Sequence, residues 1–95
     1  MNGESPKDAL DALEYPLVYA FKAMCRQSPE VDVVAQIRTV FETVLPADRL
    51  TAVRENPSRT GKFKAVTLTA TIESRAELES VYHALAADPL VVMTL

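Results

Sequence analysis

Runs of hydrophobic residues with two different periods divide the chain into strands and helices. Residues 17–25 alternate with period two, which is typical of a strand that places one face in a core. The bulkier, uncharged set assigned to the core is Leu17, Tyr19, Phe21, Ala23 and Cys25. The opposite set is also mostly apolar, but it includes Lys22, which marks that face as reachable by water or a partner.

The first helix is predicted between Ser28 and Pro46. Ser28 can cap free backbone N–H groups, Pro29 suits the first helical position, and Glu30 favours the positive end of the helix dipole. An apolar stripe then recurs at helical spacing, through Val33, Val34, Ile37, Val40, Phe41, Val44 and Leu45. Pro46 cannot continue the helix and ends the pattern.

The second half of the chain predicts two strands, a helix and a final strand. Residues 50–55 are polar enough for an edge strand, and the turn at 56–61 contains Gly61, which tolerates unusual backbone geometry. Residues 62–72 form the longest strand, with a row of threonines opposite its core set of Val66, Leu68, Ala70 and Ile72. Ser74 and Glu77 match a capping box at the start of a helix that ends at Asp88. Residues 90–95 then form a strand that is apolar on both faces.

The order β-α-β-β-α-β predicts an α+β, ferredoxin-like fold. In that fold two helices cover one face of a four-stranded antiparallel sheet with strand order 4-1-3-2. Residues 15–95 form this single domain, and residues 1–14 form a loose tail with room for a short helix at residues 9–14. A chain of 95 residues buries a limited core, so a dimer would add stability.

The face of the sheet away from the helices is the first candidate functional surface. Its apolar candidates for self-association are Val18, Ala20, Met24 and Phe63. This face is either solvated or covered by a second copy or by the N-terminal segment. We favour burial and expect a homo-oligomer, because contiguous apolar patches are uncommon on monomers.

Charge gives the second candidate surface. The chain has a net charge of −3, yet residues 49–64 contain five basic residues against Glu55 alone, a local charge of +4. The candidate contacts for an acidic partner or an anionic metabolite are Arg54, Arg59, Lys62 and Lys64. The alternative is a solvated turn that keeps an edge strand soluble.

The sequence contains no catalytic, phosphate-binding or metal-binding motif, so we expect a non-enzymatic protein without a cofactor. His83, the single histidine, falls one position off the apolar stripe of its helix and is expected on the surface. Nucleic-acid binding is less favoured, because the RNA-recognition motif stacks bases on several aromatic residues and only Phe63 lies on the open side here. The absence of a signal-peptide layout and the single cysteine favour a cytoplasmic location.

The order and spacing of a series of short motifs make the chain resemble the YbeD-like family of small bacterial proteins of uncharacterised function. They are Glu14-Tyr15-Pro16, Lys22-Ala23-Met24, Pro29-Glu30, Ser58 with Gly61-Lys62-Phe63, Val66-Thr67, Val81-Tyr82, Leu85 and Val92-Met93-Thr94-Leu95. The resemblance runs from about residue 10 to the C-terminus. It implies a fold similar to ACT domains, regulatory modules that bind amino acids, and it implies no established activity.

The resemblance also points to a ligand loop after the first strand. In ACT domains this loop often contains glycine and lets a ligand approach the backbone, whereas this chain has Cys25 where family members tend to have glycine. The corresponding candidate residues are Cys25, Arg26, Gln27 and Ser28. We therefore expect a regulatory or protein-interaction domain that self-associates, with small-molecule sensing at a dimer interface as the alternative.

Overall fold

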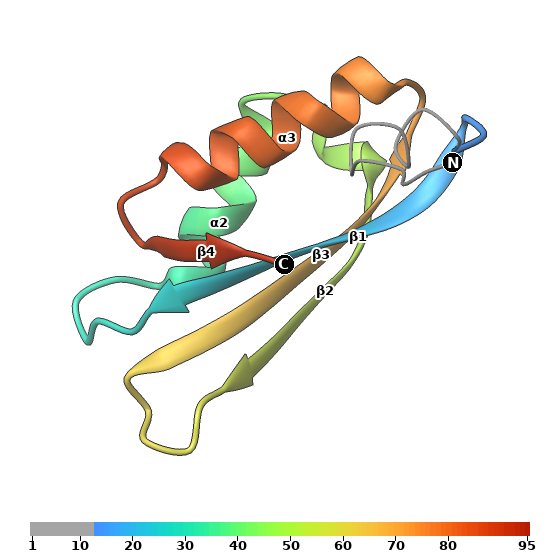
Figure 1. Cartoon of the computed structure of the whole chain (residues 1–95). Helices are drawn as coiled ribbons and strands as arrows, with labels where there is room; N and C mark the ends of the chain where they lie inside the picture. The colour runs from blue at the N-terminus through green and yellow to red at the C-terminus, as the bar shows by residue number, and fades with distance from the viewer. Residues whose placement is uncertain (1–12) are drawn as a thin grey trace, which may run out of the picture.

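The computed structural model describes residues 13–95, so the predicted short helix at residues 9–14 lies almost entirely outside the described residues. The elements in chain order are β1 (Leu17–Arg26), α2 (Val33–Glu42), the 3-10 turn η1 (Ala47–Arg49), β2 (Leu50–Pro57), β3 (Phe63–Ile72), α3 (Arg75–Ala87) and β4 (Val91–Thr94). The helices lie on one face of the sheet (Figure 1). The predicted α+β class is therefore confirmed.

The strands form one antiparallel sheet in the order β2-β3-β1-β4. This is the predicted order read from the opposite edge, so the topology is also confirmed. The two central strands pair over ten residues, from Leu17 opposite Ile72 to Arg26 opposite Phe63. Their alternate side chains supply half of the buried core: Phe21, Ala23, Cys25, Val66, Leu68, Ala70 and Ile72.

Helix α2 begins at Val33, four residues after Pro29, which was the predicted first helical residue. Asp32 is the N-cap, and its carboxylate accepts a hydrogen bond of 3.1 Å from the Ala35 amide. The Ser28-Pro29 segment instead forms a turn, in which the Val31 N–H donates to the Ser28 carbonyl at 3.2 Å. The helix starts where Val33 first reaches the core, because burying this apolar side chain favours the later of the two available caps.

The far end of α2 also differs from the prediction. The last helical residue is Glu42 and Thr43 is the C-cap, so the helix ends before Pro46. Leu45 is nevertheless buried and Val44 is half-buried, as the apolar stripe predicted. The chain thus leaves the helix through a turn whose side chains still belong to the core.

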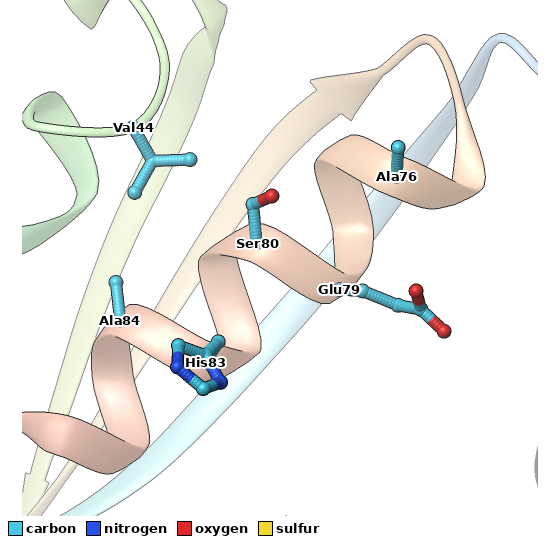
Figure 2. Close-up of a pocket in the computed structure, with 6 residues that line it drawn as sticks. All are labelled: Val44, Ala76, Glu79, Ser80, His83 and Ala84. Atoms are coloured by element: carbon cyan, nitrogen blue, oxygen red, sulfur yellow. The ribbon is translucent and has the colours of Figure 1, made fainter.

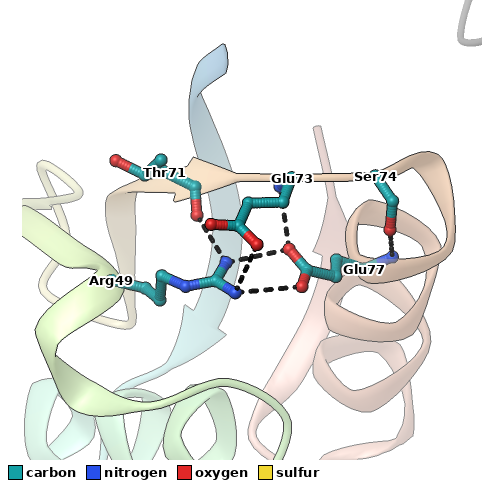
Figure 3. A network of polar contacts seen from close by, with 5 residues as sticks. All are labelled: Arg49, Thr71, Glu73, Ser74 and Glu77. Carbon is teal, nitrogen blue, oxygen red and sulfur yellow. Dashed lines mark hydrogen bonds and ion pairs between the residues drawn. The ribbon is translucent and has the colours of Figure 1, made fainter. Parts of the chain in front are cut away.

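A polar network joins η1, the end of β3 and the start of α3 (Figure 3). The predicted cap is confirmed, since the Ser74 hydroxyl accepts a hydrogen bond of 3.2 Å from the Glu77 amide. Glu77 itself pairs with Arg49 through two contacts of 2.8 and 3.0 Å and accepts the Glu73 N–H at 2.8 Å. The hydrogen bond from Arg49 lowers the pKa of Glu77, which keeps this carboxylate charged.

Three aromatic rings, two on β1 and one on α3, pack together and hold α3 against β1. The Tyr19 and Tyr82 hydroxyls are 2.7 Å apart, and the Phe21 and Tyr82 rings meet edge to face with centroids 5.1 Å apart. Burial and the hydrogen bond to Tyr19 raise the pKa of Tyr82. Both β1 aromatics, Tyr19 and Phe21, therefore belong to the core side of the sheet, as predicted from their position in the alternation.

Candidate functional site

Two loops that are 30 residues apart in the sequence meet at one end of the sheet. The Gln27 N–H donates to the Lys62 carbonyl at 2.9 Å, which joins the β1–α2 loop to the tip of the β2–β3 hairpin. This contact follows from the strand pairing, because the end of β1 lies beside the start of β3. We call this region, residues 27–32 and 58–62, the loop end.

The hairpin tip is fixed by its own hydrogen bonds. The Ser58 N–H donates to the Phe63 carbonyl at 2.8 Å, and the Gly61 N–H donates to the Ser58 carbonyl at 3.1 Å. Gly61 adopts a φ of 75°, a conformation that side chains with a Cβ resist. Glycine at this position therefore allows the tight turn of the hairpin tip next to the β1–α2 loop.

A hollow of about 300 Å³ lies between the two loops and is lined by Gln27, Ser28, Pro29 and Gly61. Its size is at the lower limit for small-molecule sites, which range from about 300 to 1,000 Å³. The Gln27 amide can both donate and accept hydrogen bonds, and the Ser28 hydroxyl can do the same. Two residues of the predicted ligand loop, Gln27 and Ser28, therefore line this hollow.

The other part of the predicted ligand loop requires a correction. Cys25 is a β1 residue with no exposed surface, and its Sγ lies 3.7 Å from the Ala23 carbonyl oxygen. Burial, with a smaller effect of Asp88, raises the pKa of this thiol to about 11. Cys25 belongs to the core because it shares the inward direction of Phe21 and Ala23, so its side chain does not enter the loop.

The four basic candidates of the hairpin do not form one cluster. The Lys64 ammonium lies 2.6 Å from the Glu55 carboxylate, so its charge is compensated within the sheet. Arg54 lies opposite Thr67 and faces away from the helices. Arg59 and Lys62 remain exposed at the loop end. The prediction was a cluster of four cations, whereas the structure has two exposed cations at the tip and one on the sheet.

The sheet face away from the helices, which we call the open face, contains all four predicted self-association residues: Val18, Ala20, Met24 and Phe63. Val18 is 65% exposed, and β4 adds Met93, which lies opposite Met24 and is 51% exposed. Self-association through these residues stays a prediction. The structure does show that, within residues 13–95, no other element covers this face (Figure 1).

A larger depression of about 530 Å³ lies outside the predicted sites, between the end of α2 and the outer side of α3 (Figure 2). Its lining residues are Val44, Ala76, Glu79, Ser80, His83 and Ala84. His83 is exposed, as predicted. Glu79 forms an ion pair with Arg75 at 2.9 Å.

Within the described part of the chain, no three acidic, histidine or cysteine residues are placed to hold a metal ion. Between residues 13 and 95 there is also no helix with the length and apolar character needed to cross a membrane.

Comparisons with known proteins agree on the family. The sequence model of the family described as "Protein of unknown function (DUF493)" matches residues 11–95. The UPF0250 protein BPP0168 of Bordetella parapertussis is 34% identical over 98 aligned positions, with full coverage of both chains. A UPF0250 protein of Leptothrix cholodnii is 29% identical over 84 positions, covering 87% of this chain and 89% of the relative.

A solved structure supports the fold independently. The solution structure of protein HP0495 from H. pylori superimposes with a TM-score of 0.70, covering 99% of this chain and 98% of the other. The sequences are 18% identical, so this likeness is evidence for a shared fold alone. The family model and the sequence relatives show that the chain belongs to the DUF493 (UPF0250) family of small bacterial proteins of unknown function.

Proposed function

We propose that the protein is a non-catalytic binding module, of a regulatory or protein-interaction kind, that takes up an anionic group at its loop end. The observation that carries the proposal is the hollow between the two loops, with two exposed cations on the same hairpin tip: Lys62, which directly follows the lining residue Gly61 and whose carbonyl accepts the Gln27 N–H, and Arg59. The ligand chemistry that fits is a carboxylate or phosphate.

The electrostatics of the loop end support an anion. Lys62 and Arg59 are exposed, and Arg26 ends the neighbouring strand opposite Phe63. Because Glu55 compensates Lys64, this residue contributes little to the attraction. An anion in the hollow would therefore meet charges from the tip and from β1, together with hydrogen-bond donors from Gln27 and Ser28.

The same anionic group could come from a small metabolite or from an acidic side chain of a partner protein, and two experiments separate these sources. For the first, thermal unfolding of the full chain is followed with amino acids, small dicarboxylates and inorganic phosphate. A ligand at 100 times its dissociation constant stabilises the fold by about 2.7 kcal/mol. For the second, the tagged protein is used for affinity purification from its native cell.

Charge reversal at the tip tests the site itself. We expect Lys62→Glu with Arg59→Glu to abolish ligand stabilisation or partner capture, because both cations border the loop end. Arg38→Glu, on the outer side of α2, is the matched control and should change neither result. If the tip double variant retains full binding while it remains folded, the loop end is not the site.

A further inference from the structure

We propose that the open face binds an acidic amphipathic segment of another protein. This inference concerns a surface that borders the loop end at Arg26 and does not depend on a ligand there. It rests on the combination of exposed apolar side chains with cations that have no acidic counterpart on the same face.

The apolar part includes a row that crosses the two central strands and reaches the β4 edge, and it includes Val18 further along β1 beyond Lys22. Met24 lies between Ala65 on β3 and Met93 on β4, so these three side chains form one row across the sheet. Val18 and Leu95 are 65% and 56% exposed. Exposed apolar patches rimmed by polar residues are a feature of interaction sites.

The charged part selects the partner. Arg54, Thr67 and Lys22 are register partners across three neighbouring strands, which puts the two cations in one row. Two strand spacings separate their backbones by about 10 Å. Arg26 adds a third cation at the end of β1, and no described strand residue on this face has a side-chain carboxylate.

This charge pattern distinguishes a foreign acidic segment from a second copy of the chain. Symmetrical stacking would bring together two open faces that each have three cations and no strand carboxylate, and like charges across an interface oppose association. An acidic partner instead supplies the missing carboxylates, while its apolar side chains cover Val18, Met24 and Met93. The face is also poorly suited to RNA, because Phe63 is its single aromatic residue among the strands.

The size of the face predicts a transient complex. Four strands of up to ten residues present about 500 Å², which is less than the roughly 800 Å² per partner of a standard stable interface. A weak interaction with strong salt dependence is expected, since exposed ion pairs are screened by salt.

The test uses the full chain, labelled with ¹⁵N, and a designed helical peptide with leucine on one face and glutamate on the other. We expect amide shifts on β1 and β3 of the open face and weaker binding as salt is raised. A Leu/Lys peptide of the same pattern should not bind. The double variant Lys22→Glu/Arg54→Glu should weaken binding about tenfold or more, because two attractive pairs become repulsive.

Three controls make the outcome decisive. Arg38→Glu should bind like the parent protein, and so should the tip variant Arg59→Glu/Lys62→Glu, which separates this surface from the loop end. Should the Glu double variant fail to fold, Lys22→Gln/Arg54→Gln provides the neutral form and should still weaken binding. Equal binding by parent and face variants, shifts confined to the helices, or a dimer in light scattering that buries the open face would overturn the proposal.

Discussion

Two valines on the central strands provide a matched test of which sheet face is covered. Val66 on β3 is fully buried beneath the helices, whereas Val18 on β1 is 65% exposed on the open face. Substitution by alanine removes two methyl groups in each case. The two variants therefore make the same chemical change on opposite sides of one sheet.

The expected costs differ because only one of these side chains leaves a cavity. Loss of two buried carbon groups costs about 1.6 kcal/mol, and the cavity brings Val66→Ala to about 2–3 kcal/mol. A domain of this length has a free energy of unfolding of roughly 5–14 kcal/mol, so this is a large fraction. Val18→Ala should cost no more than about 1 kcal/mol, mainly through lower strand propensity.

Urea unfolding followed by far-ultraviolet circular dichroism, at two protein concentrations, measures both costs. In a separate thermal unfolding experiment, we expect the melting temperature of Val66→Ala to be lower by about 10–20 °C, from the usual 4–8 °C per kcal/mol in domains of this size. If Val18→Ala costs as much as Val66→Ala, the open face is covered in solution and the reasoning is refuted. A cost that grows with protein concentration would identify a second copy as the cover.

Three further predictions address the thiol, the polar network and the hairpin tip. Because burial raises the pKa of Cys25 to about 11, iodoacetamide at pH 8 should label the folded protein far more slowly than the urea-unfolded chain; equal rates would contradict the buried placement. The lowered pKa of Glu77 stabilises the fold above its ordinary pKa of 4.5 and loses this effect as pH falls, so Glu77→Gln should unfold more easily at pH 7 and show a smaller decline in stability from pH 5 to pH 3. Gly61→Ala should destabilise by about 1–2 kcal/mol through its φ of 75°, and Gly61→Asn by less, because asparagine tolerates this conformation; equal costs in urea unfolding would show that the backbone angle is not the cause.

The two central strands could be predicted because the alternation of hydrophobic and polar residues is a local, periodic pattern. The alternation through Phe21 on β1 and Val66 to Ile72 on β3 specifies which side chains enter the core. The β-α-β-β-α-β order then leaves few ways to connect the strands. Both the sheet order and the side covered by helices follow from these two features.

The start of α2 could not be predicted because the sequence offers two helix caps and does not show which one is used. Ser28-Pro29 and Asp32 are both acceptable helix starts, and the structure uses Asp32 because Val33 packs into the core directly after it. The bidentate pair between Arg49 and Glu77 was missed for a related reason, since it joins elements that meet only in the folded chain.

Strand alternation alone indicates the direction in which two of the candidate site residues point. Lys64 has the same parity as Val66 on β3 and therefore points to the helix side, away from the surface assigned to it. Cys25 has the parity of Phe21 and points inward, which confirms its assignment to the core set of residues 17–25 over its assignment to the ligand loop. The meeting of Gln27 with Lys62 is also implied once the end of β1 is placed beside the start of β3.

Binding of an anionic group at the loop end is tested most directly by titrating the ¹⁵N-labelled full chain with a small dicarboxylate such as glutarate and with inorganic phosphate. We predict saturable amide shifts at Gln27, Ser28 and Gly61 for at least one of these anions, and their loss in the Lys62→Glu variant. If no saturable shift occurs at these residues, while acidic proteins captured from the native cell also bind the tip double variant Arg59→Glu/Lys62→Glu, the loop end is not an anion site.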